Sequence, residues 1–342
     1  MSEPADAPLR SLYEDPTVTV ASSLDRARRQ LALMEPLLDQ AAAAGRRLAI
    51  LDVGCGDGAA TALLAERAAG HTVVGADWSR MALERARARG LTLVRAGLDG
   101  AGLPLPDGVL DVVVFSEVIE HLVDTDAALD ELVRVLRPGG SLLLSTPNLA
   151  AWFNRGLLLG GVQPLFTEVS LQRIYGRPGR EVVGHLRVFT RPALLGLLRG
   201  HGLDILAVRG AAYHDTPRVL RPLDRFFQHL PSLAADLIVH ARTPFVPGPD
   251  PRPDTAPPPE GRMPIPQELL DLLACPIDKG PLLYDPDTES LYNPRLRRAY
   301  AIVDGIPHLL ADQGRAVDAA GHERIVALPG PHSEAVSGSG PR

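Results

Sequence analysis

The segment LAILDVGCGDG, residues 48–58, constrains the fold more than any other stretch of this 342-residue chain. Apolar residues lead into Asp52, glycines follow at alternate positions, and a helical pattern begins at Ala59. This order predicts a strand, a tight loop and a helix. Glycines remove side chains where the backbone must approach another group closely, and they tolerate positive φ. In a doubly wound sheet, a loop of this kind is a nucleotide-type site.

Two nucleotide ligands compete for this loop. The spacing G-x-G-x-x-A that starts at Gly54 also satisfies the dinucleotide fingerprint, so NAD is one alternative. Asp52 and Asp57 flank the loop, and their carboxylates would repel a pyrophosphate. They suit the sulfonium and ammonium groups of S-adenosylmethionine, which is the ligand we expect. Asp77 ends the next apolar run, where it would accept hydrogen bonds from ribose hydroxyls in either case.

Apolar runs alternate with helical patterns along the next hundred residues, which predicts an α/β fold with a parallel sheet covered on both faces. A less regular region at 149–190 includes a helix and lid in AWFNRGLLLGGVQPLF. The expected strands are 48–53, 72–77, 91–95, 110–115, 140–145, 203–209 and 237–241. The expected flanking helices include 24–44 and 191–201.

Three further motifs follow the first in order: GADWS at 75–79, GLDGAGLPLPDGVLDVVVFSEVIEHL at 97–122, and LRPGGSLLLSTPN at 136–148. With LDVGCGDG, they make residues 48–242 resemble the class I S-adenosylmethionine-dependent methyltransferases. The resemblance is closest to the branch that includes the ubiquinone-biosynthesis O-methyltransferases. It implies a doubly wound, mostly parallel sheet of seven strands, with the last strand antiparallel.

The same resemblance implies a set of cofactor-binding residues. Asp99 would face the adenine amino group, and Gly100 would offer its backbone N–H to the ring. Trp78 would line the adenine pocket. The expected cofactor-binding residues are Asp52, Gly54, Cys55, Gly56, Asp77, Trp78, Asp99, Gly100 and Ser116.

The segment SEVIEH after the fourth strand carries the residues for chemistry. Glu117 and Glu120 would share a face of a helical turn, with His121 four residues from Glu117. The segment resembles methyltransferases that modify the 3′-end ribose of RNA with a divalent ion. In those enzymes two glutamates, the adjacent histidine and a later histidine bind the ion, and the later position matches His185. The resemblance therefore implies Mg²⁺ held by Glu117, Glu120, His121 and His185.

Two other roles for this segment remain open. His121, with Glu120, could act on the acceptor without a metal, as base or contact. Both residues could also be purely structural. At the level of function, O-methylation of a hydroxyl on a small molecule, sugar or catechol-like acceptor is expected first. Methylation of a translation component, tRNA or a protein factor, is the alternative, and a non-catalytic cofactor-binding protein is the third.

A second resemblance covers residues 264 to about 311, from LLDLLACPIDKG to VDGIPHLL. This stretch is similar to small zinc-ribbon-like proteins that activate methyltransferases as partner subunits. The zinc-binding members use four cysteines, whereas Cys275 stands alone here, with Asp278 at the second position of the CxxC motif. We therefore expect no zinc, a module held by apolar packing, and contact with the methyltransferase domain.

The remaining sequence suggests five parts and a cytoplasmic location. The net charge of −6 gives no support for whole-chain nucleic-acid binding, and two cysteines cannot build a disulfide framework. Neither a signal peptide nor an apolar run of membrane-spanning length is visible. The expected parts are a flexible lead (1–22), the methyltransferase domain (23–242), a proline-rich linker (243–263), the activator-like module (264–314) and a disordered tail (315–342).

Overall fold

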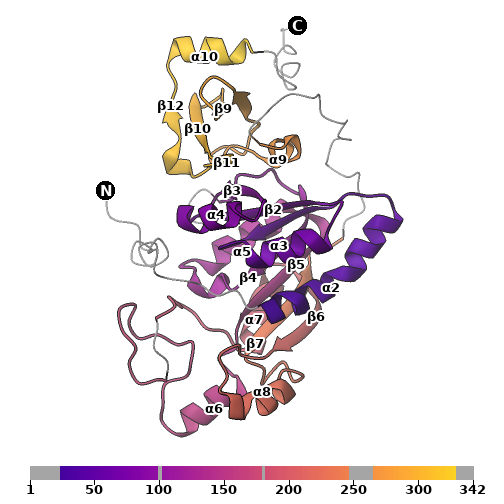
Figure 1. Cartoon of the computed structure of the whole chain (residues 1–342), viewed down its shortest axis with the longest axis vertical. Coiled ribbons are helices and arrows are strands. Elements are labelled where there is room, and N and C mark those ends of the chain that lie inside the picture. Colours follow the sequence, from indigo (N-terminus) through magenta and orange to yellow (C-terminus); the bar gives the residue numbers. More distant parts are fainter. Residues whose placement is uncertain (1–23, 99–101, 179–181, 246–264, 329–342) are drawn as a thin grey trace.

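The computed structural model describes residues 24–98, 102–178, 182–245 and 265–328 (Figure 1). The predictions for the flexible lead, for most of the linker and for residues 329–342 lie outside these ranges. Asp99 and Gly100 lie outside them as well.

Seven strands form one sheet in the order β3-β2-β1-β4-β5-β7-β6. The five strands β1 to β5 pair in parallel, and β7 runs antiparallel to both β5 and β6. This order confirms the predicted doubly wound sheet and its antiparallel last strand. The strands are β1 (Ala49–Val53), β2 (Thr72–Asp77), β3 (Thr92–Arg95), β4 (Leu110–Ser116), β5 (Leu136–Pro147), β6 (Asp204–Ala211) and β7 (Asp236–Arg242).

Helices cover both faces of this sheet because alternate strand residues point to opposite sides. Ile50 packs with Met34 and Leu64 under α2 and α3, whereas Leu51 belongs to the larger core that includes α5 and α7. No helix in the described ranges combines the length and apolarity of a membrane span. The helices are α2 (Leu24–Ala43), α3 (Ala59–Arg67), α4 (Arg80–Arg87), η1 (Ile119–His121), α5 (Thr125–Val135), α6 (Trp152–Leu159), α7 (Arg191–Gly200), η2 (Arg218–Leu220) and α8 (Arg221–Phe227).

A small antiparallel sheet forms the C-terminal module, with the side chains of Tyr292 and Tyr300 fully buried. Its strand pairs are β8–β9, β9–β10, β10–β11 and β10–β12. The elements are α9 (Gln267–Leu272), β8 (Leu283–Asp285), β9 (Ser290–Asn293), β10 (Arg298–Val303), β11 (Ile306–Pro307), η3 (Ala311–Gln313), β12 (Arg315–Ala316) and α10 (Ala319–Val326).

The chain from Arg315 to residue 328 differs from the predicted disordered tail. β12 pairs with β10, and the side chain of Asp318 accepts a hydrogen bond from Gly321 N at the start of α10. Ile325 of α10 is buried against the module. Residues 315–328 contain one glycine, Gly321, and no serine or proline, so one apolar anchor and one helix cap suffice to order this part of the segment.

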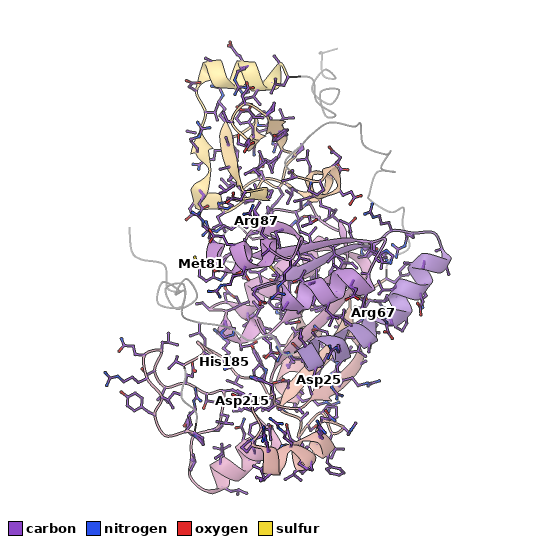
Figure 2. The ribbon with its side chains drawn as sticks, in the orientation of Figure 1. Asp25, Arg67, Met81, Arg87, His185 and Asp215 are labelled. Atoms are coloured by element: carbon purple, nitrogen blue, oxygen red, sulfur yellow. The ribbon has the colours of Figure 1, made fainter. Side chains whose placement is uncertain are left out.

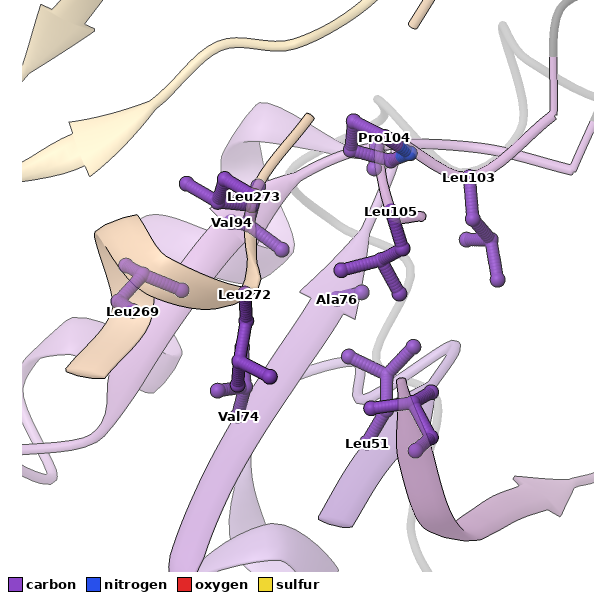
Figure 3. A pocket seen from close by; sticks show the side chains of 12 residues that line it. Leu51, Val74, Ala76, Val94, Leu103, Pro104, Leu105, Leu269, Leu272 and Leu273 are labelled. Carbon is purple, nitrogen blue, oxygen red and sulfur yellow. The ribbon is translucent and has the colours of Figure 1, made fainter. Parts of the chain in front are cut away.

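The module packs against the β3 edge of the large sheet, which confirms the predicted contact between the two parts. Leu309 N donates to Arg95 O at 2.9 Å, and Ala274 N donates to Pro104 O at 2.7 Å. Leucines of α9 and the residue after it, Leu273, reach into an apolar pocket lined by Leu51 of the large sheet (Figure 3). Main-chain hydrogen bonds and shared apolar burial thus join the module to the sheet.

The position of the second zinc-ligand cysteine is occupied by an ion pair. Asp278 Oδ2 accepts a hydrogen bond from Arg295 Nε at 2.8 Å, and Asp278 Oδ1 accepts one from Asn293 Nδ2 at 2.9 Å. The Arg295 guanidinium holds the pKa of Asp278 below its usual range. Cys275 is buried, with its Sγ 3.6 Å from the Tyr300 hydroxyl. These residues do not fit a tetrahedral thiolate site, which needs four converging ligands.

We predict that Leu273→Ala lowers the free energy of unfolding by about 2–5 kcal/mol, because it leaves a cavity where the module meets the sheet. Urea denaturation of the full chain measures this loss. Leu296→Ala, at a side chain that is 39% exposed in the same module, is the matched control, with an expected loss below about 1 kcal/mol. Equal losses for the two variants would contradict a packed interface.

Candidate active site

The loop after β1 contains three glycines with positive φ, Gly54, Gly56 and Gly58. The first two need to be glycine for different reasons. A Cβ on Gly54 (φ 77°) would lie 2.3 Å from Val118 Cγ2, so this position needs glycine for close packing. A Cβ on Gly56 (φ 56°) would meet nothing within 4 Å. Gly56 therefore needs glycine for its backbone conformation, and its Cα borders open space at the end of the strands.

Asp77 ties this loop to the next strand. Its Oδ2 accepts a hydrogen bond from Gly56 N at 2.9 Å, and its Oδ1 accepts one from Ser79 N at 2.8 Å. Gly54 N and Cys55 N both donate to Ala76 O, at 2.8 and 3.0 Å. The carboxylate therefore lies at the carboxyl ends of β1 and β2, where doubly wound sheets bind ligands.

The other two aspartates near the loop differ in environment. Asp52 is buried and accepts a hydrogen bond from Thr61 Oγ1 at 2.6 Å, and burial raises its pKa to about 6. Asp57 forms an ion pair with Arg89 at 2.9 Å. Arg89 thus offsets the charge that we expected to repel a pyrophosphate, and the acidic character of the loop rests on Asp52 and Asp77.

Three other predicted cofactor residues, Cys55, Trp78 and Ser116, lie at or just after the carboxyl ends of β1, β2 and β4. Burial raises the pKa of the Cys55 thiol well above its usual range, so this cysteine is not a reactive nucleophile. Trp78 is half-buried, and its carbonyl accepts a hydrogen bond from Arg95 Nε at 2.9 Å. Ser116 donates to Gln30 Oε1 at 2.6 Å, a contact with α2.

Of the four predicted metal ligands, the structure brings three together. One ligand atom from each of Glu120, His121 and His185 lies within 4.8 Å of the others, and the two imidazole rings are 4.9 Å apart. Glu117 faces a different set of groups. Its Oε2 lies 3.3 Å from Arg26 Nη1, and its Oε1 accepts a hydrogen bond from Ser145 Oγ at 3.0 Å.

Glu120 has an unusual hydrogen-bond pattern for a fully buried carboxyl group. Its Oε2 accepts a hydrogen bond from Thr146 Oγ1 at 2.9 Å. Its Oε1 has no hydrogen-bond partner among the described residues and lies 3.9 Å from His121 Nε2. Burial, together with the nearby Glu117, raises the pKa of Glu120 well above its usual range. A buried unpaired oxygen costs about 1–3 kcal/mol, so it calls for a partner such as an ion.

Backbone carbonyls orient both histidines. His121 Nδ1 lies 3.0 Å from Gly184 O, and His185 Nδ1 lies 3.0 Å from Phe166 O. A carbonyl oxygen only accepts, so each Nδ1 carries the proton and each Nε2 carries the lone pair. Burial lowers the pKa of His121, and burial together with His121 lowers that of His185 to about 3. Both rings are therefore neutral near pH 7, with the tautomer that metal-binding histidines use.

Aromatic side chains from separate parts of the chain lie near His185. Phe166 lies 6.2 Å from the His185 ring and 5.4 Å from Tyr213, with Phe153 of α6 at 5.9 Å. Glu168 accepts hydrogen bonds from three consecutive backbone N–H groups that end at His185. No spacing in the sequence links Tyr213 or Glu168 to the histidines, because the tertiary fold alone brings them together.

Two family profiles match the chain. One, described as a methyltransferase domain, matches residues 25–208, and the other, described as a Trm112p-like protein, matches residues 267–305. The chain therefore belongs to the methyltransferase domain family and carries a Trm112p-like domain, which confirms both predicted resemblances at the level of the family.

Individual relatives agree with this assignment. A Mycolicibacterium smegmatis protein named as an S-adenosylmethionine-dependent methyltransferase is 45% identical over 162 residues, which cover 46% of this chain and 61% of that protein. A UPF0434 protein of Gluconobacter oxydans is 51% identical over 51 residues, or 15% of this chain and 86% of that protein. The chain thus spans less than two thirds of the methyltransferase relative.

One solved structure is a complex between the Haloferax volcanii Trm112 methyltransferase activator and a methyltransferase. It matches with a TM-score of 0.42 and 17% identity, covering 66% of this chain and 96% of that one.

We predict that Asp77→Ala weakens S-adenosylmethionine binding by about 1.5–3 kcal/mol, the contribution of a hydrogen bond to a charged group. Isothermal titration calorimetry measures the change. Asp57→Ala is the matched control, because Arg89 already pairs with this neighbouring carboxylate, and its expected effect is below about 1 kcal/mol. Tight binding of NAD by the wild type, without S-adenosylmethionine binding, would contradict the assignment of the loop.

The raised pKa of Asp52 predicts a pH dependence of stability. The folded carboxyl group, with a pKa of about 6, binds its proton more tightly than the unfolded one, so its contribution to stability is present below about pH 4 and lost as pH rises through about 6. Asp52→Asn removes this pH-dependent loss of folding stability, which amounts to about 3 kcal/mol. Denaturation of both proteins from pH 4 to 7 should show the variant gaining relative to wild type, with exposed Asp25→Asn showing no such gain.

Proposed function

We propose that this protein is an S-adenosylmethionine-dependent methyltransferase that methylates a hydroxyl group on a small molecule, sugar or catechol-like acceptor. The observation that carries the proposal is the unpaired Glu120 Oε1, which lies 3.9 Å from Nε2 of His121 in a cluster that also includes His185. Glu120 and His121 lie just after β4, at the carboxyl ends of the strands, where the glycine loop after β1 also lies. Cofactor and acceptor chemistry would therefore share one crevice.

The chemistry of the donor set fits a divalent metal ion. S-adenosylmethionine supplies an activated methyl group when bound, so the protein must position the acceptor and remove its proton. A divalent ion at Glu120, His121 and His185 would lower the pKa of a bound hydroxyl. Two imidazoles among three ligands favour an ion of the first transition row over Mg²⁺, which prefers oxygen ligands. The ligand set proposed here excludes Glu117, which pairs with Arg26.

A metal-free variant of the same proposal uses His121 as the base. Its lowered pKa keeps the ring neutral near pH 7, and the hydrogen bond from Nδ1 to Gly184 O leaves the lone pair on Nε2. Glu120 would then hold the geometry of the segment. The two variants differ in one measurable respect, the requirement for an ion.

The Trm112p-like domain supports a second candidate, methylation of a translation component such as tRNA or a protein factor. The domain contacts the chain at Leu103 and Pro104, directly after the predicted adenine loop. Arg87 lies on the side of this domain, whereas His185 lies toward α6 and α8 (Figure 2). The domain therefore supports the cofactor side of the crevice and does not line the histidine cluster.

The two cysteines bear on the cellular compartment of the protein. Both cysteines of the chain are buried free thiols, which suits the reducing cytoplasm that we propose. Non-catalytic cofactor binding, the remaining alternative, gives no reason for a buried carboxyl group aimed at two histidines.

The acceptor class can be assigned directly. We predict that the purified full chain transfers label from S-adenosylmethionine to a metabolite fraction of cytoplasmic extract, with RNA and protein fractions unlabelled. Label in RNA or protein alone would replace the first candidate with the second. Absence of label in every fraction, despite cofactor binding, would favour the non-catalytic alternative.

The metal is tested by binding as well as by activity. We predict one Co²⁺ ion per chain, detected by its visible absorption, and loss of that signal in His185→Ala and in Glu120→Gln. Glu117→Ala is the matched control and should keep the signal. If wild type binds no ion while His121→Ala slows transfer by about 10²–10⁴-fold, the metal-free base is correct. Full activity of His121→Ala would contradict both variants.

A further inference from the structure

The end of the molecule farthest from the C-terminal module exposes large apolar side chains on neighbouring helices. Leu159 at the end of α6 is 91% exposed, Val219 of η2 is 85% exposed, and Phe226 of α8 is 61% exposed; Leu158 and Leu223 are exposed as well. Scattered single apolar residues are normal on protein surfaces. Here they cluster on short elements close together in space, which is typical of an interaction surface.

Contacts between α6 and α8 show that these side chains share one end of the fold. Trp152 of α6 stacks on Phe227 of α8 at 5.6 Å, and its Nε1 donates to Asp224 Oδ1 at 2.9 Å. Figure 1 shows the two helices side by side. Their buried faces are therefore used against each other, while the apolar residues named above point away from this contact and remain exposed.

Four arginines lie among these apolar residues: Arg155, Arg218, Arg221 and Arg225 are all exposed. Within the described residues, none of the four forms an ion pair with a carboxylate. The one aspartate of α8, Asp224, is buried and accepts hydrogen bonds from Trp152, Tyr213 and Thr216. We call these four arginines and the five apolar residues above the basic apolar cap.

Several arginines elsewhere in the chain do pair with carboxylates. Arg29 and Arg80 pair with carboxylates on their own helices, and Arg89 pairs with Asp57 of the loop after β1. The sequence repeats the contrast, because residues 152–230 contain eleven arginines and five acidic residues, whereas the whole chain has a net charge of −6. Residues 152–230, which include the cap, therefore carry an excess of positive charge.

We propose that the basic apolar cap docks on an anionic membrane surface. A short helix with basic and apolar residues lies in the interface of a bilayer, where the apolar side chains enter the headgroup region and the arginines contact lipid phosphates. The cytoplasmic leaflet carries negative charge that attracts such clusters. An anionic membrane would explain both features of the cap: its exposed apolar side chains and its guanidinium groups without carboxylate partners.

Docking through the cap would place the proposed acceptor site close to the membrane. Phe153, on the other side of α6, packs toward Phe166 and through it toward His185. A protein docked through the cap would hold the aromatic wall of its acceptor site next to the lipid surface. The docking itself does not depend on the proposed reaction, since it can be measured without cofactor or acceptor.

Vesicle co-sedimentation of the full chain tests the proposal. We expect binding to vesicles of phosphatidylcholine with phosphatidylglycerol, weakening with salt, and little binding to phosphatidylcholine alone. Substitution of Arg218, Arg221 and Arg225 by Gln should weaken binding to the anionic vesicles on the order of 100-fold, about fivefold for each charge. Leu159→Ser combined with Phe226→Ser should also reduce it.

Matched controls distinguish an effect of the cap residues on vesicle binding from an effect of the chain's overall charge or apolar surface. Replacement of three exposed arginines elsewhere, Arg28, Arg85 and Arg315, by Gln should leave most of the binding, as should Leu206→Ser on the exposed face of β6. Circular dichroism verifies that each variant is folded.

Three results would overturn the proposal. The first is no binding to anionic vesicles, or binding that the cap variants do not change. The second is self-association of the wild type that the cap variants abolish, with no vesicle binding, which would assign the cap to a second copy of the chain. The third is cap-dependent binding to single-stranded RNA without binding to vesicles, which would assign it to nucleic acid.

Discussion

The buried carboxyl group of Glu120, just after β4, is the group whose burial most constrains the surrounding structure. Glu120 is fully buried, and burial of an ionisable group is costly unless its atoms find partners. Thr146 of β5 satisfies one oxygen, and the Glu120 carbonyl accepts hydrogen bonds from Leu186 N and Arg187 N. These bonds join η1 to β5 and to the segment that contains His185, which they hold beside His121.

The parallel sheet and the cofactor loop could be predicted from the sequence because local signals determine them. Apolar runs predicted each strand of the large sheet close to its observed position, and the positive φ of Gly54 and Gly56 explains why the loop needs glycine. The C-terminal helix α10 was missed for the opposite reason. Its stability depends on Ile325 packing against the module, a tertiary contact that local composition does not reveal.

Which of the predicted metal ligands lie together was less predictable, because the spacing argument assumed one continuous helical turn. Glu117 has a positive φ of 56°, and the short helix η1 begins only at Ile119. The chain therefore turns between the two glutamates, so that Glu117 points to Arg26 and Ser145 while Glu120 points to the histidines. Residue spacing predicts a shared face only where the backbone keeps its helical period.

The C-terminal domain and the helices α6 and α8 lie at different parts of the large sheet. At the β3 edge, the Trm112p-like domain adds main-chain hydrogen bonds and apolar burial next to the segment that follows the predicted adenine loop. At the carboxyl ends of β5 and β6, α6 and α8 lie near an aromatic wall beside His185 and present exposed arginines to solvent. In a parallel sheet, the ligand crevice at the carboxyl ends lies between such attachments. Under the proposed function, the domain would act on the cofactor side and the helices on the acceptor side, without disturbing the strands between them.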